Sequence, residues 1–153
     1  MTMSDIPWAT TSDAFDELWE DHVPALDGVP DTLVTMMKQQ AEHMRAYAEL
    51  QHTTPSIPEH DWGKLDLPLV QAKLRESAGY MVEELYEAIG HLKNKPWKQS
   101  FKEVDGDAFR EEVSDATHFF LEFLILAGIS PEQLFLEYFR KTLINEHRRQ
   151  TGY

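Results

Sequence analysis

The sequence predicts an all-α fold, a helical bundle of about four to five helices. Apolar side chains recur at intervals of three and four residues along several long segments, as they do on one face of a helix. Proline, glycine and serine gather between those segments, where turns are expected. No stretch shows the alternation of apolar and polar residues that is typical of a strand.

Composition restricts the classes of protein to which this chain can belong. The chain has 153 residues, enough for one domain with a substantial core. Its net charge of −13 disfavours nucleic acid and anionic membranes as partners, because both require a basic surface. No apolar run approaches membrane-spanning length, no secretory signal is recognisable, and the absence of cysteine excludes disulfides and thiolate metal sites. We therefore expect a cytoplasmic protein that binds neither nucleic acid nor membrane.

The N-terminal part divides into an extension and the start of the main domain. Residues 1–29 are expected to form the extension, with a short helix capped by Ser12, and residues 30–153 to form the domain. A first long helix is expected from Pro30 or Asp31 to about Gln51, since proline suits the first helical position. Three prolines and a glycine then predict a loop over 53–68.

The next two helices, about 68–92 and 107–127, are central and each carries a short acidic run. Within each run two carboxylates lie three residues apart, namely Glu84 with Glu87 and Glu112 with Asp115. Residues at that spacing share one helix face, where like charges repel each other. Two such pairs brought together would offer oxygen ligands to a hard divalent cation, Mg²⁺ first and Mn²⁺ as an alternative. The competing interpretation is that they decorate solvated faces.

Apolar stripes place these carboxylates at the border of the core. On the first acidic helix the expected stripe comprises Leu74, Ala78, Met81, Leu85, Ile89 and Leu92. On the second it comprises Phe109, Val113, Ala116, Phe120, Leu124 and Ala127. From Phe119 to Leu126 this second helix is apolar on almost every side, and only Glu122 interrupts the run. We therefore expect another subunit to cover it.

The last helix has a clear beginning. Gly128 fits the end of the preceding helix, and Ser130 and Gln133 have the spacing of a capping box around Pro131. This helix is expected to run to about Arg149.

Two alternative interpretations remain open. Asp115 and His118 have the carboxylate-x-x-histidine spacing of di-iron bundles, but Glu87 and His91 are four residues apart, not three. We interpret His118 as a core or supporting histidine. The second alternative is a non-catalytic acidic helical module that binds a regulatory partner.

The motifs together resemble the all-α nucleoside triphosphate pyrophosphohydrolases, the family that includes MazG and the dimeric dUTPases. Its Glu-x-x-Glu and Glu-x-x-Asp helices correspond to the two acidic pairs. The bacteriophage dCTPase-dUTPase branch is similar in three further features, a Lys-Pro-Trp-Lys loop at 95–98, an aspartate followed by His-Phe-Phe at 118–120, and a patterned tail. The tail residues are Lys141, Asn145, Arg148, Gly152 and Tyr153. The likeness covers roughly residues 30–153.

The resemblance implies hydrolysis of a (deoxy)nucleoside triphosphate to the monophosphate and pyrophosphate, which would control the dNTP pool. It implies a Mg²⁺ site made by the four paired carboxylates, and a homo-oligomer, either dimer or tetramer. Glu83 or Glu87 would orient or deprotonate the attacking water. The location would be the host cytoplasm if the chain is phage-encoded.

The resemblance also implies substrate-binding residues. Phosphates would be bound by Lys98, Lys141 and Arg148, with hydrogen bonds from Asn145 and Tyr153. Trp97 is a candidate to stack on the base, with a packing role as the alternative, and for Trp62 packing is the favoured role. The base would be read from the first long helix. There Gln40 fits the family pattern, but His43 stands where the dimeric dUTPases have asparagine; the alternative register pairs Gln39 with Glu42. This departure leaves dUTP, dCTP and a purine such as dGTP open as substrates.

Overall fold

The computed structural model describes residues 31–50, 55–93, 95–99 and 102–152, and every regular element in these segments is helical. In chain order the elements are α2 (Thr32–Leu50), η3 (Glu59–Asp61), α3 (Pro68–Gly90), α4 (Gly106–Leu126) and α5 (Pro131–Thr151). The predicted all-α fold is therefore confirmed, and each α-helix boundary lies within two residues of its expected place. The N-terminal extension and its predicted helix lie outside the described residues.

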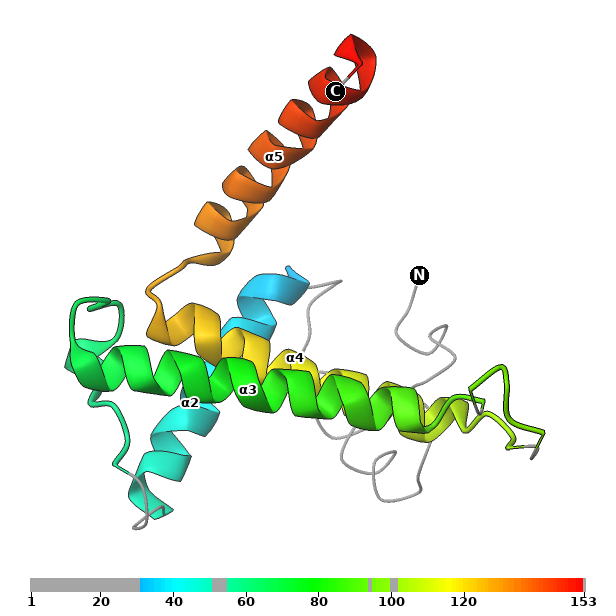
Figure 1. The fold of residues 1–153 in the computed structure, drawn as a ribbon. Helices are drawn as coiled ribbons and strands as arrows, with labels where there is room; N and C mark the ends of the chain where they lie inside the picture. Colours follow the sequence, from blue (N-terminus) through cyan, green and yellow to red (C-terminus); the bar gives the residue numbers. More distant parts are fainter. Residues whose placement is uncertain (1–30, 51–54, 94, 100–101, 153) are drawn as a thin grey trace.

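The centre of the fold is an antiparallel pair, α3 and α4, which pack side by side along most of their length (Figure 1). Helix α2 crosses this pair and contacts α4. Helix α5 turns away from α4 by 102° and projects from the rest of the molecule (Figure 1). The bundle that can build a site is thus α2, α3, α4 and the segment before α3.

The N-terminal ends of α4 and α5 are set by local hydrogen bonds. The Asp105 side chain accepts from the Ala108 backbone N–H at 3.1 Å and caps α4. Ser130 and Gln133 form the capping box of α5, with bonds of 3.2 and 2.9 Å. Both boundaries follow from residues that satisfy the free N–H groups at a helix N-terminus.

Two apolar clusters hold the helices together. The first contains Met37, Leu121 and Leu124, with Leu33, Ile125, Ile129 and Leu134 packed against it. The second contains Ile57, Val70 and Leu126, with Met44, Trp62, Leu67 and Leu74 around it. Both clusters draw on α4, so this helix joins α2, α3 and the segment before α3 into one core.

The segment before α3 is fastened to the end of α4 by two glycines. Gly63 and Gly128 have φ values of +84° and +71°, which residues with a side chain rarely adopt. The Gly63 N–H donates to the carbonyl of Leu126 at 3.0 Å. A Cβ on Gly128 would lie only 2.8 Å from the Gly63 Cα, so the close approach requires glycine.

The predicted apolar stripe of α3 is wrong in its C-terminal half. Leu85, Ile89 and Leu92 are 42%, 56% and 37% exposed, whereas the fully buried positions of α3 are Val70, Ser77 and Ala88. Those three positions lie on one face at helical spacing, and Glu84 shares that face. The face of α3 that packs is therefore rotated about the helix axis, by about the angle between consecutive residues, from its most apolar face. This rotation points the Glu84 carboxylate toward α4.

The reason for expecting another subunit over α4 is also corrected. Leu121, Leu124 and Leu126 are at most 4% exposed in the single chain, because α2 and the segment before α3 cover them. Two residues of the predicted α4 stripe, Val113 and Phe120, are nevertheless 37% and 39% exposed, and more apolar surface is uncovered on α5. All of residues 135–151 on α5 are exposed, including Phe135, Leu136, Tyr138, Phe139, Leu143 and Ile144.

No single helix within the described segments has the length and apolar character needed to cross a membrane. Only α4 and α5 taken together pass that test, and they are bent by 102° at the break between them.

Candidate active site

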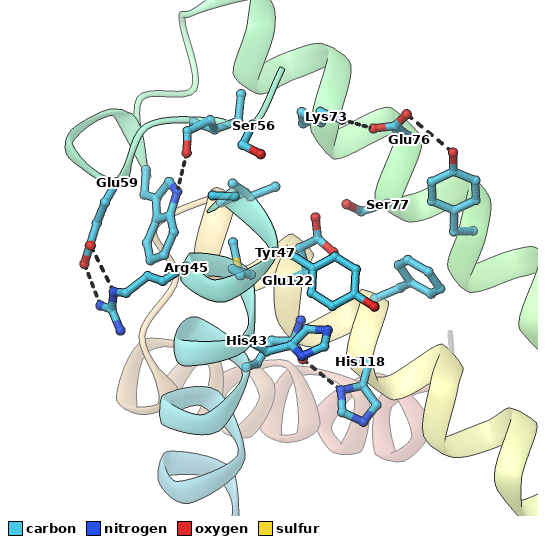
Figure 2. A pocket seen from close by; sticks show the side chains of 18 of the residues that line it. His43, Arg45, Tyr47, Ser56, Glu59, Lys73, Glu76, Ser77, His118 and Glu122 are labelled. Carbon is cyan, nitrogen blue, oxygen red and sulfur yellow. Dashed lines mark hydrogen bonds and ion pairs between the residues drawn. The ribbon is translucent and has the colours of Figure 1, made fainter. Parts of the chain in front are cut away.

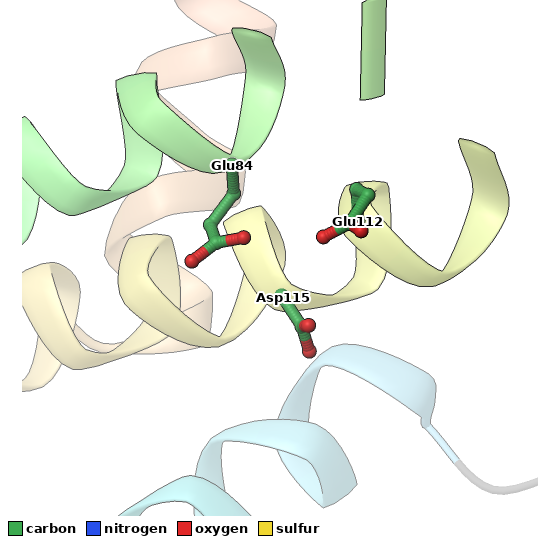
Figure 3. Close-up of side chains that lie close together, drawn as sticks. All are labelled: Glu84, Glu112 and Asp115. Atoms are coloured by element: carbon green, nitrogen blue, oxygen red, sulfur yellow. The ribbon is translucent and has the colours of Figure 1, made fainter. Parts of the chain in front are cut away.

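Three carboxylates from the two acidic helices come together. Glu84 of α3 faces Glu112 and Asp115 of α4, and one oxygen of each lies within 4.8 Å of one oxygen of the others (Figure 3). Glu84 and Glu112 are half-buried, and Asp115 is exposed. The antiparallel packing of α3 and α4 is what brings residues so distant in sequence together. We name these three residues the carboxylate cluster.

The electrostatics of the cluster are unfavourable without a cation. Desolvation raises the pKa of Glu84 above its ordinary value, and the charges of Glu87, Asp115 and Glu112 raise it further. A divalent cation would relieve this repulsion, and hard cations prefer carboxylate oxygens. The donor set therefore fits Mg²⁺ or Mn²⁺, as three of the four predicted ligands are in place.

One histidine supports the cluster from the end of α3. The Nε2 atom of His91 lies 3.5 Å from Oε1 of Glu112, and both side chains are largely shielded. The His91 carbonyl also accepts from the Asp105 N–H at 3.0 Å, which joins the end of α3 to the start of α4. His91 thus lies beside a candidate ligand, in the position that outer partners of metal ligands commonly occupy.

A large cavity opens beside the cluster. It has a volume of about 880 Å³ and lies between α2, α3, α4 and the segment 56–62 (Figure 2). Glu84 and Asp115 belong to its wall, so the cluster and the cavity are continuous. Six aromatic rings also line it, those of His43, Tyr47, Trp62, Tyr80, His118 and Phe119.

The aromatic side chains of the cavity come from all three helices. The ring centroids of His43 and Tyr47 on α2 are 4.4 Å apart, and those of Tyr80 on α3 and Phe119 on α4 are 5.3 Å apart. Trp62 lines the cavity from the segment before α3, and its Nε1 donates to the Ile57 carbonyl at 3.2 Å. Aromatic rings beside polar side chains that can form hydrogen bonds suit a planar heterocycle such as a nucleobase.

Polar groups in the cavity are fixed by one another. Gln40 is only 4% exposed, and its Oε1 lies 2.8 Å from Nδ1 of His118. His118 therefore contacts α2 rather than the carboxylate cluster, and no histidine belongs to that cluster in the described part of the chain. This arrangement matches a supporting histidine and disfavours the di-iron alternative.

The base-reading residues expected on α2 are close to this cavity. Gln40 and His43 both line it, whereas Gln39 and Glu42 of the alternative register are exposed and do not. The structure therefore favours the Gln40 register geometrically. That these side chains bind the base stays a prediction.

The other expected residues lie apart from the cluster. Glu83 and Glu87 are exposed on α3, though the charge of Glu87 acts on Glu84. Trp97 is 75% exposed under the Lys95 ammonium, and Lys98 is exposed beside it. None of these four lines the cavity.

The residues expected on α5 are not brought to the cavity either. Lys141, Asn145 and Arg148 are exposed on the projecting helix, and none belongs to the cavity wall. Tyr153 lies outside the described residues. The proposal that these side chains bind phosphate remains a prediction.

Sequence reasoning missed most polar residues of the wall, among them Ser77 and Glu122 (Figure 2). Ser77 is 2% exposed, and Glu122 is half-buried opposite it. The signal for Glu122 was present, since it alone interrupts an apolar run of α4. Ser77 gave none, because a single serine in a helix is unremarkable without knowledge of its neighbours.

The comparisons with known proteins give a distant relative. The chain is 29% identical over 107 residues to a dCTP pyrophosphatase of Enterobacteria phage LZ5. The match covers 55% of this chain and 62% of the relative, so the chain spans less than two thirds of the length of the protein it matches. No protein-family model and no solved structure matches. The chain is thus a distant homologue of a phage pyrophosphatase.

Proposed function

We propose that this protein is a divalent-metal-dependent pyrophosphohydrolase that cleaves a deoxynucleoside triphosphate to its monophosphate and pyrophosphate. The observation that carries the proposal is that Glu84 and Asp115 belong both to the carboxylate cluster and to the cavity wall. A nucleoside in the cavity would place its phosphates beside the cluster. The distant similarity to a phage dCTP pyrophosphatase supports the same chemistry. Such an activity would control the cell's dNTP pool.

Glu84, Glu112 and Asp115 would hold the metal. When bound, a divalent ion supplies charge neutralisation to phosphate oxygens and acidifies a coordinated water. The carboxylates themselves fix its position through the rigid α3–α4 pair, and His91 holds Glu112 in orientation. Positioning of this kind accounts for most of the catalysis in phosphoryl transfer.

We assign to Glu87 the orientation of the attacking water and the acceptance of its proton. Glu87 lies three residues after Glu84 and therefore on the same face of α3, and its charge raises the pKa of Glu84. In the reaction the water oxygen bonds to the α-phosphorus as the bond to the bridging α–β oxygen breaks. Pyrophosphate then leaves with that oxygen.

The phosphate-binding cations are proposed to act in a homo-oligomer. Lys141 and Arg148 sit on α5, which projects from its own bundle and exposes six large apolar side chains. Helix α3 exposes a second apolar face at Val82, Leu85, Tyr86 and Ile89. Burying these surfaces between copies would stabilise an oligomer and would place α5 of one copy on another. Lys98, on the loop after α3, is the cation proposed from the same chain.

The test is a survey of all common NTPs and dNTPs with Mg²⁺ or Mn²⁺, with products separated by ion-exchange chromatography. We expect monophosphate and pyrophosphate in equal amounts, and none in EDTA. Reaction in ¹⁸O-water should label the monophosphate, because attack is at the α-phosphorus. Release of single phosphates would contradict the proposed bond cleavage. Absence of turnover with every nucleotide would favour the non-catalytic acidic module.

A further inference from the structure

Glu122 is a carboxylate of the cavity wall that the proposed reaction does not use. It lies two helical turns after Asp115 on α4, so the two side chains share one face about 10 Å apart. On α3, Ser77 precedes Glu84 by the same two turns. Because the helices are antiparallel, Ser77 lies opposite Glu122 as Glu84 lies opposite Asp115. The cavity thus has two polar levels, one at the cluster and one two turns away.

At the second level the carboxylate of Glu122 is close enough to the Ser77 hydroxyl for this group to lower its pKa, and both residues line the cavity. The nearest cation, Lys73, donates instead to Glu76 at 2.5 Å. No ion pair joins Glu122 to a cation in the segments that the structure describes. His43 of α2 lines the same cavity (Figure 2). Glu122 therefore retains acceptor capacity directed into the cavity.

A half-buried carboxylate in such surroundings is poorly solvated. Burial raises the pKa of Glu122 above its ordinary value, and the Ser77 hydrogen bond offsets this only in part. Rings of Tyr47, Tyr80 and Phe119 line the cavity around it. An N–H group of a ligand would donate a hydrogen bond to Glu122 and so replace its lost hydration. A carbonyl oxygen at the same place would be unfavourable, because both groups accept hydrogen bonds.

We propose that Glu122, oriented by Ser77, accepts a hydrogen bond from an exocyclic amino group of the base and so selects amino-bearing bases over uracil and thymine. The inference rests on the proposed function, since it takes the cavity to hold the base of the substrate. Cytosine and uracil provide the sharpest contrast, because they present an amino group and a carbonyl oxygen at the same ring position. Sites built to bond a polar group discriminate strongly against analogues that cannot satisfy it.

The experiment compares kcat/KM for dCTP and dUTP in the wild type, Glu122→Gln and Glu111→Gln. Glu111 is the matched control, an exposed glutamate of the same helix that does not line the cavity. We expect the wild type to favour dCTP by at least about tenfold. Glu122→Gln should reduce that ratio at least about tenfold, because an amide can also donate to the uracil oxygen. Glu111→Gln should retain the wild-type ratio.

A binding measurement makes the test independent of catalysis. Calorimetric titration of the metal-free protein with dCMP and dUMP should show the same preference, and Glu122→Gln should lose it. Circular dichroism checks that the variant is folded. If it is not, Ser77→Ala is used, and we expect it to reduce the preference about threefold, as loss of one supporting hydrogen bond should.

The outcomes separate the two proposals. Turnover with an unchanged dCTP/dUTP ratio in the folded variant, or a wild-type preference for dUTP, overturns the assignment of Glu122 alone. If no nucleotide is hydrolysed but the wild type binds dCMP more tightly than dUMP through Glu122, the proposed reaction is wrong and the assignment stands. Equal binding of dCMP and dUMP by the wild type contradicts it.

Discussion

The bundle of α2, α3 and α4 differs from the projecting helix α5 in how many of its functional side chains meet other residues of the same chain. In the bundle, acidic residues from two helices meet at oxygen separations within 4.8 Å beside a cavity of about 880 Å³. On α5, every residue from 135 onward that the structure describes is exposed. The bundle thus holds the candidate metal ligands and the cavity within one chain. Helix α5 is a surface that needs a partner, which we propose is a second copy of this chain.

The largest expected effect tests the bundle. Glu112→Gln removes one negative ligand from the carboxylate cluster and leaves the side-chain volume nearly unchanged. We expect pyrophosphate release to fall at least about 100-fold, because the remaining carboxylates cannot hold the cation in place. Steady-state rates with saturating Mg²⁺ and with Mn²⁺ measure this loss.

Glu111→Gln is again the matched control, since its exposed side chain lies outside the cluster. Its rate should remain within about twofold of the wild type, as for most surface substitutions. The metal-free Glu112→Gln protein should be at least as stable as the wild type, because a repulsive charge is gone. Full activity of a folded Glu112→Gln protein would refute the metal site.

The second prediction tests α5. Phe139→Glu places a charge in the exposed apolar face of this helix, where the native side chain is 51% exposed. We expect the dissociation constant of the oligomer to rise at least about 30-fold, as for an aromatic residue central to an interface. Light scattering coupled to size-exclusion chromatography over a dilution series measures it.

Gln150→Glu adds the same charge near the exposed end of α5 and should leave the oligomer largely intact. A wild-type protein that is monomeric at all concentrations would contradict the proposed oligomer. The apolar side chains of α5 would then need a partner other than this chain.

Helix positions could be predicted from the sequence because they depend on local chemistry. The capping box at Ser130 and Gln133 and the glycine at 128 are encoded within a few residues, and both are present as expected. Which face of α3 packs was not predictable in the same way. Leu85 and Ile89 are more apolar than Ser77 and Glu84, yet the latter pair faces α4. The choice depends on partners distant in sequence.

The same distinction between local and long-range features applies to the candidate site. The spacing in the sequence was enough to find Glu84, Glu112 and Asp115, because carboxylates paired on one helix face repel each other unless a cation is bound. The cavity could not be found, since it depends on how the helices cross and on the segment that carries Trp62. Glu122 was visible as a charge in an apolar run, but its role required knowing that Ser77 lies opposite.

The smallest predicted effect concerns the joint between the bundle and α5. Gly128→Ala forces a side chain into a positive-φ conformation and places a Cβ 2.8 Å from the Gly63 backbone. We expect a loss of at least about 1–2 kcal/mol in the free energy of unfolding, measured by urea denaturation. Gly79→Ala is the control, because a Cβ at this position inside α3 would meet nothing within 4 Å; it should stabilise by about 0.4–1 kcal/mol. Since the glycine contact fastens the segment that forms one cavity wall, Gly128→Ala should also weaken dCMP binding, while the oligomer surface of α5 remains functional. Equal stabilities of the two variants would show that the joint is not held by this contact.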